Sequence, residues 1–133
     1  MNAPERRMPE AAMNVTVDQA AHRLATRLEL PVLARWLQDV LGQPLVALIA
    51  GVRDPKLVGK WAKGECAPEP KGEQRLRHAF EVTLLLLERE CSDTIRAWFV
   101  GMNPELDDHA PALALADDPE NVLMAARTFL AHG

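Results

Sequence analysis

The amino-acid sequence predicts an all-α fold. Apolar residues recur at three- and four-residue spacing along most of the chain, which is the period of an amphipathic helix. No segment alternates apolar and polar residues over the length of a strand, tyrosine is absent, and β-branched residues are sparse. Proline and glycine stand repeatedly where helices begin and end. These three observations together favour short helices joined by tight turns.

The N-terminal half is expected to contain four helices after a short tail. The first fourteen residues contain two prolines and three methionines, and we expect them to be a disordered tail. Proline suits the first turn of a helix because its missing N–H has no partner there, and glycine commonly ends one. The predicted helices are one from Thr16, one from Pro31 to Gly42, one from Pro44 to Ala50, and one from Asp54-Pro55 to about Gly64.

The C-terminal half is expected to contain a central helix and three further helices. Apolar residues cover nearly the whole circumference between Glu73 and Glu90, which indicates a helix buried in the fold or at a subunit contact. The following helix, capped by Ser92 or Asp93, should end at Asn103-Pro104. Its predicted buried face is Ile95, Trp98, Phe99 and Met102. A short helix (112–116) and a last helix follow, the latter from Asp118-Pro119 to about Ala131 with Val122, Ala126, Phe129 and Leu130 facing inward.

Composition excludes several classes of protein. The longest apolar runs, such as Val82 to Leu87 with Thr83 interrupting it, are far too short to cross a bilayer, so we expect a cytoplasmic chain without a membrane partner. The two cysteines form no CxxC pair, and the four histidines are scattered, so neither a disulfide framework nor a metal site is predicted. The triplet Asp107-Asp108-His109 is the strongest acid–base or metal candidate, but adjacent loop residues do not generally converge on one ion. We expect no enzyme and no cofactor.

One short segment is strongly basic. Between Gly51 and Gly64 there are four basic residues and one acid, a net charge of +3 in a chain of net charge −4. The two short helices around Gly51 have the outline of a helix-turn-helix, with Leu45, Leu48, Ile49, Val52, Leu57, Val58 and Trp61 facing inward. The residues left outside would contact DNA phosphates and base edges. The predicted DNA-binding residues are Arg53, Lys56, Gly59, Lys60 and Lys63. The alternative is a solvated helix face.

The final third of the chain has the opposite charge. From Cys91 to Gly133 there are seven acids and two basic residues. Such a surface repels DNA and suits a protein partner with a basic or polar cleft, although on charge alone an ordinary acidic surface is the better explanation.

The segments VRDPKLVGKWAKGE, RLRHAF and AWFVGMNPELDDHAPALALADDPENVLMAARTFL together resemble the Xre/MbcA/ParS-type antitoxins, over roughly Leu41 to Leu130. The resemblance implies a non-enzymatic partner of a RES-domain, NAD-consuming toxin. Such a partner covers the toxin's active-site cleft, and the complex represses its own promoter DNA. The toxin-binding residues that it implies are Asn103, Pro104, Leu106, Arg127, Phe129, Leu130 and His132, of which Phe129 and Leu130 are equally well explained as core. Trp61 lies ten positions after Gly51, one more than in the usual repressor turn, which implies either a different docking of the second helix or weak DNA binding.

These expectations divide the chain into a tail (1–14), a helix-turn-helix DNA-binding region (15–72) and a helical toxin-binding region (73–133). A homodimer, or a larger hetero-oligomer with the toxin, would place two recognition helices about one DNA turn apart, ~34 Å. Two alternatives stay open. The chain could be a stand-alone helix-turn-helix transcription regulator with a C-terminal dimerisation module. It could also be a toxin-binding module whose helix-turn-helix no longer binds DNA.

Overall fold

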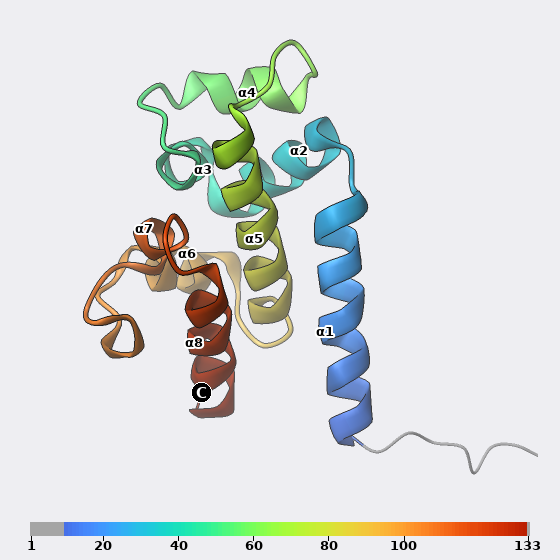
Figure 1. Cartoon of the computed structure of the whole chain (residues 1–133), viewed down its shortest axis with the longest axis vertical. Helices are drawn as coiled ribbons and strands as arrows, with labels where there is room; N and C mark the ends of the chain where they lie inside the picture. The colour runs from blue at the N-terminus through green and yellow to red at the C-terminus, as the bar shows by residue number, and fades with distance from the viewer. Residues whose placement is uncertain (1–9, 133) are drawn as a thin grey trace, which may run out of the picture.

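The computed structural model describes residues 10–132 of the chain, and the side chains of residues 18–132 (Figure 1). Within those residues the regular structure is entirely helical, apart from one isolated bridge between Asn103 and His109. The prediction of an all-α fold is therefore confirmed. The elements are α1 (Glu10–Arg27), α2 (Leu30–Leu41), α3 (Gln43–Ala50), α4 (Lys56–Ala62), α5 (Pro70–Leu86), α6 (Ser92–Val100), the 3-10 turn η2 (Pro104–Leu106), α7 (Pro111–Ala114) and α8 (Pro119–His132).

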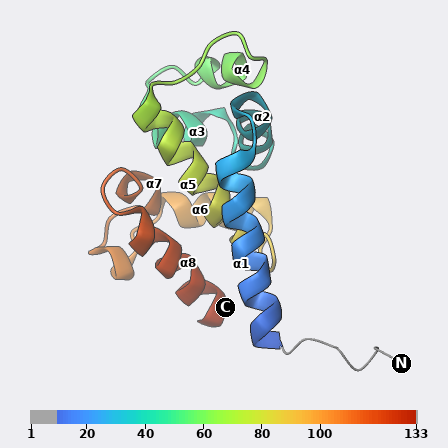
Figure 2. The same ribbon diagram turned by 45° about the vertical axis from the view of Figure 1, so that its right-hand side comes forward.

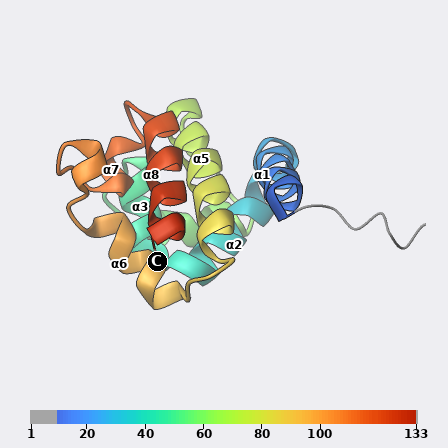
Figure 3. The same ribbon diagram turned by 90° about the horizontal axis from the view of Figure 1, so that it is seen from below.

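Helix α5 is the centre of the fold. It packs against α1 on one side and α8 on the other, and α3 and α2 also contact it (Figure 3). It begins at Pro70, before the expected Glu73, so the boundary drawn between residues 72 and 73 falls inside this helix. One cluster of buried apolar side chains runs from Leu33 on α2 to Ala126 on α8. Both predicted regions therefore share a single hydrophobic core.

Helix α1 lies along the outside of α5 (Figure 3). It begins at Glu10 rather than near Thr16, so residues 10–14 are helical, and the rest of the predicted tail, residues 1–9, lies outside the described residues. The guanidinium of Arg77 donates to the carbonyls of Ala25 (3.0 Å) and Leu28 (2.7 Å). These bonds supply partners to carbonyl groups at the C-terminal end of α1 that have none within the helix.

Helices α2, α3 and α4 form a compact unit at one end of the molecule, and α4 packs chiefly on α2. Gly42 (φ 87°) and Gly51 (φ 85°) end α2 and α3 in backbone conformations that favour glycine, as predicted. The carboxylate of Asp54 accepts the backbone N–H of Lys56, the first residue of α4, at 3.0 Å, although the N-cap position itself is Pro55 rather than the expected Asp54. One expectation for this unit was wrong: Leu48 is 43% exposed, because it lies on the side of α3 that faces away from the core.

The C-terminal segment departs furthest from the sequence-based expectation. Helix α6 ends at Val100 and not at Asn103, and its N-cap is Cys91 rather than Ser92 or Asp93. Ile95 and Phe99 are buried as predicted, but Met102 is 80% exposed. A buried face at i, i+3, i+4 and i+7 requires the helix to continue, and here the last position lies beyond its end. Val122 and Ala126 of α8 are buried, whereas Phe129 and Leu130 are partly buried against the core.

Candidate binding surfaces

The predicted DNA-binding side chains gather on α4 and the turn before it. Arg53, Lys56, Lys60 and Lys63 are all exposed, and within residues 10–132 none of them forms an ion pair with an acid. We call these four residues the basic surface. Figures 1 and 2 both show α4 at one end of the molecule, away from the lower part of α8. The carboxylate of Asp54 lies among these four cations, so the segment has a net charge of +3, which still attracts polyanions.

Gly59 has a different role from the other predicted DNA-binding residues. It is partly buried, on the flank of α4 that faces two glutamines. A Cβ atom at this position would lie 3.0 Å from Nε2 of Gln43 and 3.7 Å from Oε1 of Gln38. The missing side chain therefore lets α4 pack closely against the junction of α2 and α3. The glutamine pair is a feature of this surface that the sequence analysis missed.

An apolar groove lies at the other end of the molecule. The end of α6, the loop after it and the last half of α8 form its walls, which enclose about 490 Å³. We call this the C-terminal groove, and it is lined by Trp98, Met102, Asn103, Pro104, Glu105, Ala125, Thr128, Phe129 and His132. Four of the seven residues that the resemblance assigns to partner binding are in this lining: Asn103, Pro104, Phe129 and His132.

The other three residues of that predicted set point elsewhere. Leu106 is 7% exposed and belongs to the core. The guanidinium of Arg127 contacts the carboxylate of Asp18 on α1 at 2.9 Å. Leu130 is partly buried against the core, and its carbonyl accepts a hydrogen bond from Arg89 at 3.1 Å. These three residues hold α8 in place rather than line the groove.

Aromatic rings form one wall of the C-terminal groove. The ring of Trp98 meets Phe99 edge-on, with centroids 5.3 Å apart, and lies 6.4 Å from the ring of Phe129. The indole Nε1 of Trp98 is buried and has no hydrogen-bond partner among the described residues. A buried donor without an acceptor costs about 1–3 kcal/mol, and the fully buried hydroxyl of Thr83 likewise has no partner among the described residues. Trp98 and Met102 were predicted to be core, and the structure places both in the groove lining.

The loop after α6 is closed by its own hydrogen bonds. Asn103 Oδ1 accepts the backbone N–H of Glu105 at 2.9 Å, and the Asn103 carbonyl accepts those of Leu106 and Asp108, each at 2.9 Å. Asp107 (φ 55°) and Asp108 (φ 64°) both have left-handed backbones, which are strained for residues other than glycine. Asn103, Pro104 and Leu106, which the resemblance assigns to toxin binding, thus have a local structural role as well. Asn103 caps the turn, Pro104 starts it, and Leu106 anchors it in the core.

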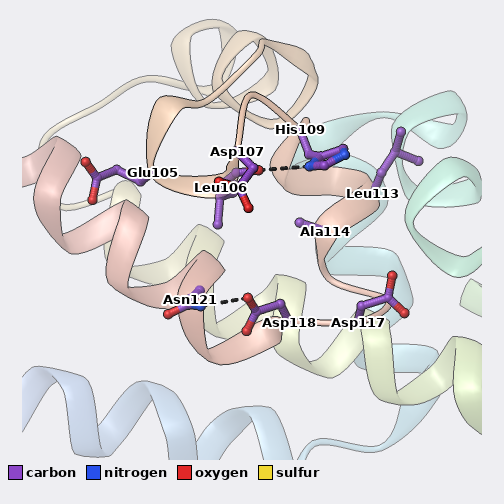
Figure 4. A pocket seen from close by; sticks show the side chains of 9 residues that line it. All are labelled: Glu105, Leu106, Asp107, His109, Leu113, Ala114, Asp117, Asp118 and Asn121. Carbon is purple, nitrogen blue, oxygen red and sulfur yellow. Dashed lines mark hydrogen bonds between the residues drawn. The ribbon is translucent and has the colours of Figure 1, made fainter.

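An acidic pocket adjoins the groove and shares Glu105 with it (Figure 4). It encloses about 350 Å³, and Asp107, Asp117 and Asp118 also line it. The ring Nδ1–H of His109 donates to the carbonyl of Leu106 at 3.0 Å, which occupies that nitrogen. Among residues 10–132, no group of three or more side chains is arranged to hold a metal ion.

The described part of the chain contains no helix long and apolar enough to cross a membrane. Comparison with other proteins identifies no relative: no family model matches the chain, and neither a curated protein nor a solved structure is significantly similar to it.

Proposed function

We propose that this protein is the antitoxin of a type II toxin–antitoxin pair, which binds and neutralises a RES-domain, NAD-consuming toxin and, with it, represses its own promoter. The observation that carries the proposal is the C-terminal groove. Four residues that the sequence resemblance assigns to toxin binding line this one groove. The basic surface lies far from it, on α4. Toxin and DNA could therefore be bound together, in the cytoplasm, where NAD and the promoter are found.

The groove has the chemistry of a protein-binding surface. Tryptophan, phenylalanine and methionine are enriched at interfaces because they offer large apolar area around a few fixed polar groups. Here Trp98, Phe129 and the exposed Met102 supply the apolar area. Glu105 and His132 lie in the same lining and supply polar groups. A partner segment with an apolar anchor would fit this surface.

The basic surface suits duplex DNA. Lysine and arginine side chains neutralise phosphates and release the counterions around the duplex, which makes such binding strongly dependent on salt. Helix α3, the turn at Gly51 and α4 would form the helix-turn-helix, with α4 presented to the major groove. Two copies held by the toxin, or by each other, would place two such helices on one face of the DNA.

The toxin-binding proposal is tested with two exposed methionines. The chain is co-expressed with the product of the neighbouring gene, the candidate toxin, and co-elution and NAD loss are measured. Met102 lines the groove, whereas Met124 is 58% exposed on α8 outside it. We expect Met102→Asp to weaken the complex roughly 30-fold or more and to restore NAD loss, because a carboxylate would replace an apolar anchor. Met124→Asp is the matched control and should behave like the wild type.

Two results would count against this proposal in different ways. If the unaltered chain neither co-elutes with the toxin nor suppresses NAD loss, the antitoxin function is wrong. If the toxin binds both variants as tightly as the wild type, the function stands but the groove is not its surface. Point substitutions are preferred to truncation of α8, since Val122 and Ala126 of that helix are part of the core.

The DNA-binding proposal is tested through the salt dependence of affinity. Each phosphate contact contributes about 0.9 to the slope of log K against log salt concentration. We therefore expect Lys60→Ala to lower this slope by about 0.9 for promoter DNA. Arg23→Ala, an exposed cation on α1, should leave it unchanged. If Lys56→Glu with Lys60→Glu leaves promoter binding by the toxin complex intact, the chain is a toxin-binding module without a DNA role.

A stand-alone transcription regulator is the second candidate function, and the same groove favours it. An apolar groove on each of two copies could form a two-fold interface. In this case the chain alone would be a dimer in sedimentation equilibrium, and Met102→Asp would make it monomeric. Under the antitoxin proposal, the substitution changes toxin binding but leaves the mass of the isolated chain unaltered.

A further inference from the structure

Two glutamine side chains are hydrogen-bonded to each other beside the basic surface. Nε2 of Gln43, the first residue of α3, donates to Oε1 of Gln38 on α2 at 2.8 Å. Both side chains are partly exposed. This bond uses one of the two amide hydrogens of Gln43. Its second N–H and its Oε1 form no hydrogen bond with another described side chain, so the amide is oriented while a donor and an acceptor remain available.

The two glutamine amides lie beside Gly59, at the edge of the basic surface. Gly59 is the only position on that flank of α4 without a side chain, and a Cβ atom there would come within 3.0 Å of Gln43 Nε2. Lys56 precedes Gly59 by three residues and Lys63 follows it by four, so both lysines share its side of the helix. The glutamine pair therefore borders the lysines and is not separated from them by a bulky side chain.

The basic surface and the glutamine pair differ in what they can recognise. A lysine ammonium has three donors and no acceptor, and it attracts the phosphates of any sequence. Recognition of a base pair needs a pattern of donors and acceptors. Adenine presents an N6 donor beside an N7 acceptor in the major groove, and a glutamine amide matches that pair with two hydrogen bonds. By themselves, the cations can donate to O6 and N7 of guanine, but they offer no acceptor for the N6 amino group of adenine.

We propose that Gln43, held in place by Gln38, is a specificity-determining residue of the DNA interface and reads an A·T base pair. Gln38 is a positioning residue, because its Oε1 fixes the orientation of the Gln43 amide. Gly59 provides the space that lets α4 and the amide approach the same stretch of duplex. This inference rests on the DNA-binding part of the proposed function, and it adds recognition of adenine to a surface whose lysine and arginine side chains are donors only.

The test is selection of bound duplexes from a random-sequence DNA pool, with the full chain in complex with its toxin. The affinity for the selected sequence is then divided by that for random DNA. We expect Gln43→Leu to lower this ratio roughly 5- to 150-fold, with the affinity for random DNA and the salt slope unchanged. Gln38→Leu should lower it less without changing the preferred base. Gln19→Leu, an exposed glutamine on α1, is the matched control.

One substitution gives a signature that a purely structural role would not. A glutamate side chain can only accept hydrogen bonds, and it pairs with the N4 amino group of cytosine. Gln43→Glu should therefore change the preferred base at one position of the selected sequence from A to C. Thermal unfolding of each variant establishes that it is folded.

The outcomes separate this inference from the function on which it rests. If Gln43→Leu and Gln43→Glu are folded and select the same sequence with the same ratio as the wild type, the glutamine has no role in recognition, although DNA binding stands. If the unaltered complex enriches no sequence but binds random DNA, the interface has no sequence recognition and the inference is wrong. If the complex binds no duplex, the DNA-binding function itself is wrong.

Discussion

The two ends of this molecule use the same residue type in opposite ways. Trp61 on α4 is 2% exposed, and the core surrounds it beneath the basic surface. Trp98 on α6 is only partly buried, and it lines the C-terminal groove with an indole N–H that no described residue accepts. At one end the aromatic ring supports a charged surface from beneath, whereas at the other the ring itself is part of the surface. The difference therefore leaves a charged surface at one end of the molecule and an apolar one at the other.

The largest expected effect comes from removing each tryptophan in turn. Trp61→Ala should lower the free energy of unfolding by about 3–5 kcal/mol, because it leaves a cavity in the core. Trp98→Ala should lower it by about 1–2 kcal/mol, since its ring is partly exposed and its buried donor is unsatisfied. Urea denaturation followed by circular dichroism measures both values. Equal losses for the two variants would show that the groove wall is as much a part of the core as α4.

The next effect compares two glycines at helix crossings. Gly72 on α5 is buried, and a Cβ atom there would lie 2.9 Å from the backbone carbonyl of Ala50, which cannot move without shifting α3. We expect Gly72→Ala to destabilise the fold by about 1–3 kcal/mol. Gly59→Ala should change stability by less than about 1 kcal/mol. Its nearest neighbour is the flexible end of Gln43, and alanine favours the helix. In urea, Gly72→Ala should therefore unfold at a lower midpoint concentration than Gly59→Ala. The reverse order of the two midpoints would contradict the prediction.

A smaller effect compares two side-chain caps. Asp54 accepts the N–H of the first residue of α4 at 3.0 Å, and Asn103 caps the turn after α6 at 2.9 Å. Each substitution by alanine should lower the free energy of unfolding by about 1 kcal/mol. Only Asn103→Ala should also weaken toxin binding, because that turn forms a wall of the groove, and Asn103→Asp should restore it. The prediction fails if Asp54→Ala weakens toxin binding as much, as measured by isothermal titration calorimetry.

The smallest effect concerns the thiol at the start of α6. Hydrogen bonds from the backbone N–H and the hydroxyl of Thr94 lower the pKa of Cys91, since both stabilise the thiolate. A lower pKa populates the reactive thiolate at lower pH. In a Cys66→Ser background, alkylation of Cys91 by iodoacetamide should therefore reach half its maximal rate at a lower pH in the folded chain than in urea. Thr94→Val should move that midpoint to higher pH. An unchanged midpoint would show that the Thr94 hydroxyl does not lower the pKa of Cys91.

The helical class and several helix ends followed from local chemistry. Pro31, Pro119, Gly42 and Gly51 act on their own backbone and its immediate neighbours, so their effect is visible without knowledge of the fold. The position of the basic surface followed in the same way, because four cations within one short segment remain close together in any helical arrangement. Its binding to DNA stays a prediction, as does the binding of a toxin to the groove.

Tertiary packing decided what each position faces. Met102 fits a buried periodic face in sequence, but α6 ends before it, and the side chain lies in the groove. Gly59 looks like an open position on a basic helix, yet it is the contact with Gln43, a residue sixteen positions earlier in the chain. A periodic pattern describes one helix at a time. The surface that a side chain reaches depends on where that helix ends and which other helix lies against it.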